Sequence, residues 1–180
     1  MNRLVLMLTM VFGVFTAQAS ELGITVEEAY AKTQQEKKVL LIDVRDPVEI
    51  MFTGSAEAAD INIPFMLVDR SRYNTERNIF AMDINQNFAQ QVKDELAKRG
   101  LDENTEVITM CRSGSERGEP SAKVLREAGL ANARYVIHGF QGDALKEGPQ
   151  AGMRLQNGWQ NSGLPWTRTL NPDKIYREDR

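Results

Sequence analysis

The sequence has very few residues that could build a covalent or metal-held framework. It contains one cysteine, Cys111, and one histidine, His138, in 180 residues. One cysteine cannot form an internal disulfide, so the hydrophobic core alone must hold the fold together. One cysteine and one histidine also provide too few ligands for a typical protein-built zinc site. We therefore expect no metal, and no motif indicates an organic cofactor.

An excess of positive charge is also missing. The 22 Lys and Arg residues are outnumbered by 25 Asp and Glu residues, which gives a net charge of −3. Proteins that bind nucleic acid or anionic lipid by bulk electrostatics need a clustered basic face, so nucleic acid is not an expected partner. Hydrophobic residues make up 42% and charged residues 26% of the chain, as in one ordinary globular domain.

The sequence has only one long apolar segment, and it lies at the N-terminus. Arg3 provides a short basic start, an apolar run extends from Leu4 to Phe15, and Ala17-Gln18-Ala19 follows. This pattern is typical of a secretory signal peptide, and we expect cleavage after Ala19. An uncleaved membrane anchor is the alternative, although the run is shorter than the roughly 20 residues that cross a bilayer. Residues 1–19 thus predict a periplasmic or secreted protein with no membrane contact after cleavage.

The remaining residues, 20–180, alternate between strand and helix signals. Helices are expected over residues 25–35, from Asp46 onward, over residues 87–98 and from residue 119 to Gly129. Three apolar runs have the length of strands: Val39–Ile42, Glu106–Met110 and Arg134–Ile137. Runs of this kind fit strands covered on both faces. The order predicts a single α/β domain with a largely parallel central sheet flanked by helices, followed by a C-terminal tail.

Several segments carry no clear periodicity. Residues 53–83 predict a long irregular surface excursion, apart from a short possible strand within residues 61–68. A turn and a short helix are expected over residues 139–145, and a polar tail over residues 147–163. Asn171-Pro172-Asp173-Lys174 resembles a last helix start.

The only cysteine stands where α/β proteins bind ligands. Cys111 directly follows a predicted strand and precedes a loop and a helix, and ligands bind at the carboxyl ends of parallel strands. Small loop residues let backbone N–H groups turn toward an anion, and the following helix adds the positive end of its dipole. A thiolate is stabilised there, so we expect Cys111 to be the nucleophile rather than an inert core thiol. The candidate substrate-binding residues of the loop are Arg112, Ser113, Gly114, Ser115, Glu116 and Arg117.

An ordered set of motifs resembles the rhodanese-like family across almost the whole mature chain. The motifs are Leu41-Ile42-Asp43-Val44-Arg45 with Glu49, Asn62-Ile63-Pro64, Cys111-Arg112-Ser113-Gly114, Ser121-Ala122-Lys123 with Leu125, Ala128-Gly129-Leu130, Gly139-Phe140-Gln141-Gly142 and the segment Gly158–Pro165.

This resemblance implies a rhodanese-like fold and a sulfurtransferase. Its Cys111 would carry sulfane sulfur as a persulfide, from a small anionic donor such as thiosulfate to a cyanide-like or thiol acceptor, including a protein thiol. The resemblance also implies that Asp43 and Arg45 form a buried structural pair near the loop.

Two departures from the family pattern leave other functions open. Five residues separate Cys111 from Arg117, because Glu116 occupies the usual place of the arginine, and the longer loop predicts a wider cradle. Gly54-Ser55-Ala56-Glu57 stands where the family often has a Gly-His-Ile turn. The five-residue spacing also occurs in cysteine-dependent phosphatases and arsenate reductases, although their loops usually have histidine where Met110 stands here. A non-catalytic module that binds a partner or senses redox state is a third possibility.

Some charged and aromatic residues have two interpretations. Arg112 and Arg117 could bind an anionic substrate, or be solvated or paired with carboxylates such as Glu116 or Glu119.

His138 could act as a general base for Cys111, but a packing role at a strand end is expected instead. Trp159 and Trp166 are expected to cover the core rather than stack on a ligand.

Overall fold

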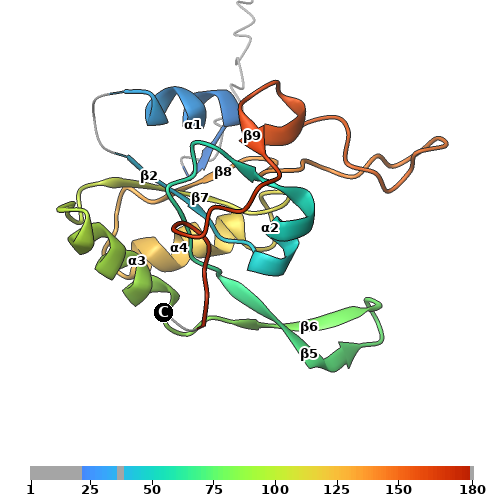
Figure 1. Ribbon diagram of the computed structural model, residues 1–180, viewed down its shortest axis with the longest axis horizontal. Helices are drawn as coiled ribbons and strands as arrows, with labels where there is room; N and C mark the ends of the chain where they lie inside the picture. The colour runs from blue at the N-terminus through green and yellow to red at the C-terminus, as the bar shows by residue number, and fades with distance from the viewer. Residues whose placement is uncertain (1–21, 36–38, 179–180) are drawn as a thin grey trace, which may run out of the picture.

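A parallel sheet forms the centre of the domain (Figure 1). The structure is a computed structural model that describes residues 22–35 and 39–178, so the predicted signal peptide lies outside the described residues. All strand pairs of the five-stranded sheet are parallel, which confirms the predicted fold class. Its strands, in spatial order, are β1 (Gly23–Ile24), β8 (Arg134–Val136), β7 (Glu106–Met110), β2 (Val39–Asp43) and β4 (Ile61–Asn62).

The helices begin where the sequence predicts them. Within the described residues they are α1 (Val26–Thr33), α2 (Pro47–Thr53), α3 (Phe88–Lys98) and α4 (Gly118–Glu127). The capping box before α1 is complete, because Thr25 and Glu28 each accept a hydrogen bond from the other's backbone N–H, at 3.2 and 3.0 Å. Asp46 caps α2 by accepting from the backbone N–H of Val48 at 2.8 Å. None of the described helices is long and apolar enough to cross a membrane.

Helices cover both faces of the sheet, which explains why its strands are continuously apolar. Side chains of β2 alternate between the faces: Leu40 and Ile42 pack with α3 and α4, whereas Leu41 packs with α1. Figure 1 shows α1 and α3 on opposite sides of the sheet. Trp159 is completely buried in the layer with α1, as expected for a residue that covers the core.

The predicted irregular excursion over residues 53–83 is wrong in its second half. Residues of β5 (Met66–Asn74) and β6 (Ile79–Ile84) pair as an antiparallel hairpin that projects from the body of the domain (Figure 1). No residue of either strand is buried, so neither face needs an alternating apolar pattern, and that pattern is the sequence signal for a strand.

Cross-strand side-chain contacts stabilise this hairpin instead of a core. The rings of Tyr73 and Phe80 meet edge to face with centroids 6.1 Å apart. Arg72 lies between two carboxylates, pairing with Asp69 at 2.6 Å and also with Asp83 across the hairpin. Contacts of this kind join strands whose pairing the sequence alone does not reveal.

The C-terminal part differs from the sequence prediction in small details. The predicted short helix within residues 139–145 is absent: residues 139–141 form a turn, residues 142–145 are irregular, and residues 171–174 form a turn rather than a helix start. A single 3₁₀ turn, η1 (Trp159–Asn161), precedes β9 (Trp166–Thr167), and β9 pairs antiparallel with β3 (Ser55–Ala56). The tail therefore packs back onto the segment that follows α2.

A buried ion pair lies at the carboxyl end of β2. Arg45 is completely buried, and its Nε donates to Asp43 Oδ1 at 2.9 Å. Its two terminal nitrogens donate to Thr53 Oγ1 at 2.8 Å and to the Gly54 carbonyl at 2.9 Å. The guanidinium also lies 4.3 Å from the ring centroid of Phe140. These contacts satisfy a charge that would otherwise be very costly to bury.

Replacing Asp43 with alanine should lower the free energy of unfolding by about 3–5 kcal/mol, because it leaves the Arg45 charge buried without its partner. Thr53→Ala removes one hydrogen bond of Arg45 and should cost about 1 kcal/mol. Urea denaturation followed by circular dichroism measures both changes. Asp69→Ala, which removes a carboxylate from the exposed pair with Arg72, is the control and should change little. Equal effects of Asp43→Ala and Asp69→Ala would contradict this account.

Candidate active site

Cys111 lies directly after the central strand β7, with its thiol against loop backbone. Its Sγ accepts a hydrogen bond from the backbone N–H of Gly114 at 3.2 Å, and only 1% of the residue is exposed. Gly114 has a φ of +87°, and a Cβ there would lie 2.8 Å from the His138 nitrogen, so the turn requires glycine. Gly118 begins α4, and a Cβ on it would be 3.4 Å from Sγ. The N–H group and the helix start both favour negative charge beside the sulfur.

The turn after β8, residues 137–141, is hydrogen-bonded to the Cys111 loop. The backbone N–H of Phe140 donates to the Cys111 carbonyl at 2.8 Å, and that of Gln141 donates to the Arg112 carbonyl at 2.9 Å. A Cβ at Gly139 would lie 2.3 Å from the Cys111 carbonyl oxygen, so no side chain fits this contact. The close packing fixes the loop at the carboxyl end of β7.

Arg117 is buried and locked to α2. Its two terminal nitrogens donate to the two carboxylate oxygens of Glu49, at 2.7 and 3.1 Å. Burial opposes the positive charge, but the hydrogen bond and charge of Glu49 outweigh it and raise the pKa of Arg117. This bidentate pair joins the start of α4 to α2. The guanidinium is therefore engaged by the protein itself.

The two carboxylates that the sequence suggested as its partners bind elsewhere. Glu116 pairs with Arg77 of the hairpin at 2.5 Å, and Glu119 pairs with Lys123 one turn along α4 at 2.7 Å. Glu116, predicted to bind substrate, thus connects the loop to the hairpin.

Arg112 lies on the exposed side of the loop. Its Nε donates to Gln141 Oε1 at 2.9 Å, and no carboxylate of the described residues lies within 4.0 Å of its guanidinium. Burial and the nearby positive charge of Arg154 lower the pKa of Arg112. Ser113 and Ser115 lie beside it on the wall of the site. These loop residues remain available to a ligand.

His138 does not have the packing role expected from the sequence. Its side chain is about half exposed, and its Nδ1 lies 2.6 Å from Asp143 Oδ2. It is not among the described residues that line the cleft at Cys111. Across residues 22–35 and 39–178, no three His, Cys, Asp or Glu side chains come together as a metal site.

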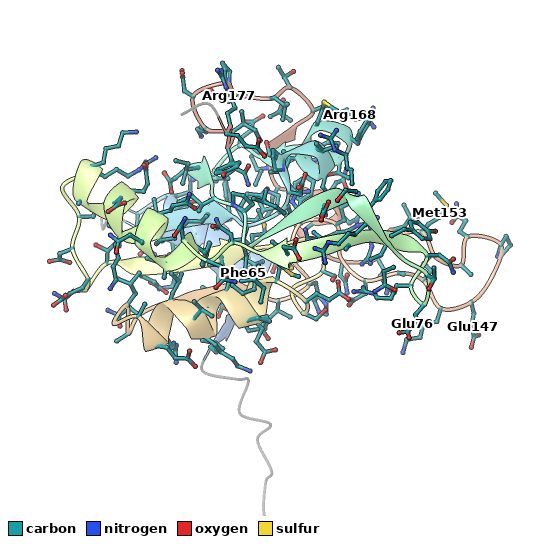
Figure 2. All side chains as sticks on the ribbon, turned by 90° about the horizontal axis from the view of Figure 1, so that it is seen from below. Phe65, Glu76, Glu147, Met153, Arg168 and Arg177 are labelled. Atoms are coloured by element: carbon teal, nitrogen blue, oxygen red, sulfur yellow. The ribbon has the colours of Figure 1, made fainter. Side chains whose placement is uncertain are left out.

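An open cleft of about 1070 Å³ lies above the loop, with Cys111 among its lining residues. The hairpin provides one wall, through Arg77 and Phe80, and the segment 143–156 provides the other, through Lys146 and Arg154. Figure 2 shows the hairpin end at Glu76 and the segment bearing Glu147 and Met153 reaching out on the same side of the molecule. Sequence reasoning missed both walls because neither has a motif, and the only signal was a scatter of Arg and Lys in two polar stretches.

Comparison with known proteins identifies the domain type. The family model of the rhodanese-like domain matches residues 25–145. A crystal structure of Rv0390 from M. tuberculosis is similar with a TM-score of 0.59 and 26% sequence identity, covering 82% of this chain and 97% of that chain. The polysulfide-sulfur transferase homodimer from Wolinella succinogenes has a TM-score of 0.45 and 21% identity, covering 81% and 77%. No curated protein matches the sequence.

Glu49→Gln should loosen the Cys111 loop, because a neutral amide cannot hold Arg117 as the carboxylate does. We expect the free energy of unfolding to fall by about 2 kcal/mol and alkylation of Cys111 by iodoacetamide to become faster. The alkylation rate is measured by mass spectrometry on the native protein. Glu119→Gln removes a carboxylate from the exposed pair with Lys123 and should leave the rate unchanged. If the two variants react alike, the Glu49 pair does not position the loop.

Proposed function

This chain belongs to the rhodanese-like domain family, and we propose that it is a sulfurtransferase in which Cys111 carries sulfane sulfur as a persulfide. The observation that carries the proposal is the position of Sγ, which accepts the Gly114 N–H and adjoins the first residue of α4. This environment suits both a thiolate and a charged persulfide. The cleft above it provides access for a donor and an acceptor.

The loading step uses a small anionic donor such as thiosulfate. The Cys111 thiolate attacks the sulfane sulfur of the donor, a new S–S bond forms, and the S–S bond within thiosulfate breaks with its electron pair leaving on sulfite. The charges balance, since thiolate and thiosulfate become an ionised persulfide and sulfite. Arg112 and the loop N–H groups favour the approach of the dianion.

The discharge step regenerates the thiolate. A nucleophilic acceptor, cyanide in the simplest assay, attacks the outer sulfur of the persulfide, and the Cys111 sulfur leaves with the electron pair of the broken bond. Thiocyanate forms, and no oxidant, reductant or metal takes part in the balance.

Phosphatase or arsenate-type chemistry is the second candidate, and the five-residue spacing between Cys111 and Arg117 favours it. In that chemistry the arginine clamps a tetrahedral oxyanion with two hydrogen bonds. Such a clamp would use the two terminal nitrogens of Arg117, but here both of them donate to the Glu49 carboxylate. Displacing the partly buried Glu49 carboxylate would leave the buried Arg117 charge without its partner, so this contact supports sulfur transfer over hydrolysis.

Incubating the protein with thiosulfate should add one sulfur atom, about 32 Da, to the intact mass, and cyanide should remove it. Cys111→Ser should gain no mass and lose turnover while keeping its circular dichroism spectrum. An unmodified mass with an otherwise reactive thiol would contradict the proposal and favour a non-catalytic binding or redox-sensing module. Hydrolysis of an aryl phosphate that requires both Cys111 and Arg117 would favour the phosphatase candidate.

We also propose that the protein is exported to the periplasm or the cell exterior after cleavage at Ala19. Removing 19 residues from a chain of 180 leaves 161. N-terminal sequencing of the full-length chain expressed in a bacterium should then begin at Ser20. A mature protein that starts at residue 1 or 2 and fractionates with the membrane would indicate an uncleaved anchor.

A further inference from the structure

The cleft above Cys111 has an excess of positive charge, although the chain as a whole is acidic. Arg112, Lys146 and Arg154 line it, and among the described residues none of the three has a carboxylate within 4.0 Å. Arg154 donates to the Gly142 carbonyl, and Arg112 donates to the Gln141 side chain, so both lie around the same turn. Cations gathered in this way are complementary to an anionic ligand.

Apart from Arg77, the hairpin wall of the cleft is apolar. Val68, Ile79, Phe80 and Met82 line it from the hairpin, and about half of the Phe80 side chain is exposed. The edge-to-face contact with Tyr73 holds the Phe80 ring in place. Beyond the cleft, Met153 and Leu155 of the 143–156 segment are also about half exposed. Exposed apolar residues on both the hairpin and this segment are typical of a surface that contacts another protein.

The size and depth of the cleft also favour a large ligand. Its volume of about 1070 Å³ lies just above the range of small-molecule sites, roughly 300–1,000 Å³, and far exceeds what thiosulfate or cyanide needs. Cys111 is only 1% exposed, so an acceptor must deliver its thiol on a narrow, extended stem. A cysteine within an extended protein segment has that shape.

From these observations we propose that the sulfur acceptor is a cysteine in an acidic, partly apolar segment of another protein, bound between the hairpin and the 143–156 segment. The inference rests on the proposed sulfurtransferase function. The carboxylates of the acceptor segment pair with Arg112, Lys146 and Arg154, and its apolar side chains pack on Ile79 and Phe80.

The transfer requires no co-reactant. The acceptor cysteine, as its thiolate, attacks the outer sulfur of the Cys111 persulfide and forms a new S–S bond. The bond between this sulfur and Cys111 Sγ breaks, and the electron pair leaves on Sγ. The acceptor departs as an ionised persulfide, and Cys111 is again a thiolate. The proton that the acceptor thiol lost before the attack converts this acceptor persulfide to a hydropersulfide, so the charges balance.

The first experiment compares two synthetic nine-residue peptides as acceptors for the thiosulfate-loaded full-length chain. Both have a central cysteine flanked by Leu and Phe; one carries four Glu residues, and the other carries Lys in their place. The acidic peptide should discharge the persulfide about tenfold faster at low salt, and the difference should shrink at high salt because ions screen exposed charges. Equal rates for the two peptides would overturn the proposal.

Two variants and two matched controls locate the binding surface. Lys146→Glu and Phe80→Ser should each slow discharge to the acidic peptide about three- to tenfold, because each removes a contact of the proposed surface. Lys98→Glu on α3 and Phe52→Ser on α2 make the same changes at exposed sites outside the cleft and should have no effect. Discharge to cyanide should be unchanged in the two controls, and in the two cleft variants it should slow less than discharge to the acidic peptide does, because cyanide makes no contact that depends on either cleft wall. If the controls slow discharge as much as the cleft variants, the assignment of the surface is wrong.

A binding measurement separates this inference from the proposed function. Fluorescent versions of both peptides, with serine in place of cysteine, are titrated with unloaded protein and followed by anisotropy. Preferred binding of the acidic peptide without persulfide loading would retain the docking surface and refute the sulfurtransferase. Persulfide loading without preferred binding of the acidic peptide would retain the sulfurtransferase and refute the docking surface. Mercaptosuccinate, a small anionic thiol, is the last acceptor to compare. If it discharges the persulfide as fast as the acidic peptide does, and Phe80→Ser does not change its rate, then the cleft serves a small molecule and the proposal is overturned.

Discussion

The burial of one arginine determines how the active-site edge of this domain is built. The Arg45 guanidinium has no access to solvent, so every donor must be satisfied by the protein. Asp43 supplies the opposite charge, Thr53 and the Gly54 carbonyl accept its remaining hydrogen bonds, and Phe140 covers its face. The end of β2, the end of α2 and the turn after β8 are thereby held together.

This arrangement reaches the nucleophile through two further contacts. Because α2 is fixed at its C-terminal end, Glu49 in its first turn is positioned to hold Arg117, and with it the start of α4. On the other side, Phe140 both covers Arg45 and donates its backbone N–H to the Cys111 carbonyl. The loop around Cys111 is thus held from α2 and from the turn after β8. A rigid loop of this kind is what an anion-binding active site requires.

The sequence predicted the features that depend on local chemistry. Thr25 and Asp46 have the side chains that cap a helix, and the apolar run at Val39–Ile42 has the composition of a strand covered on both faces. Features that depend on distant pairing were not predictable. Arg117 and Glu49 are 68 residues apart, and nearer carboxylates offered equally good partners on paper. The hairpin has no buried face, so no periodic pattern marks it, and the cleft that it forms with the 143–156 segment could not be inferred.

Isotopic labelling of the donor tests the central claim most directly. Thiosulfate can be labelled with ³⁵S in either the sulfane or the sulfonate position. If Cys111 attacks the sulfane sulfur, only the sulfane label becomes bound to the peptide that contains Cys111 and is later released as thiocyanate by cyanide, while the sulfonate label appears in sulfite. Label from the sulfonate position on that peptide, or sulfane label bound equally well by Cys111→Ser, would contradict the account.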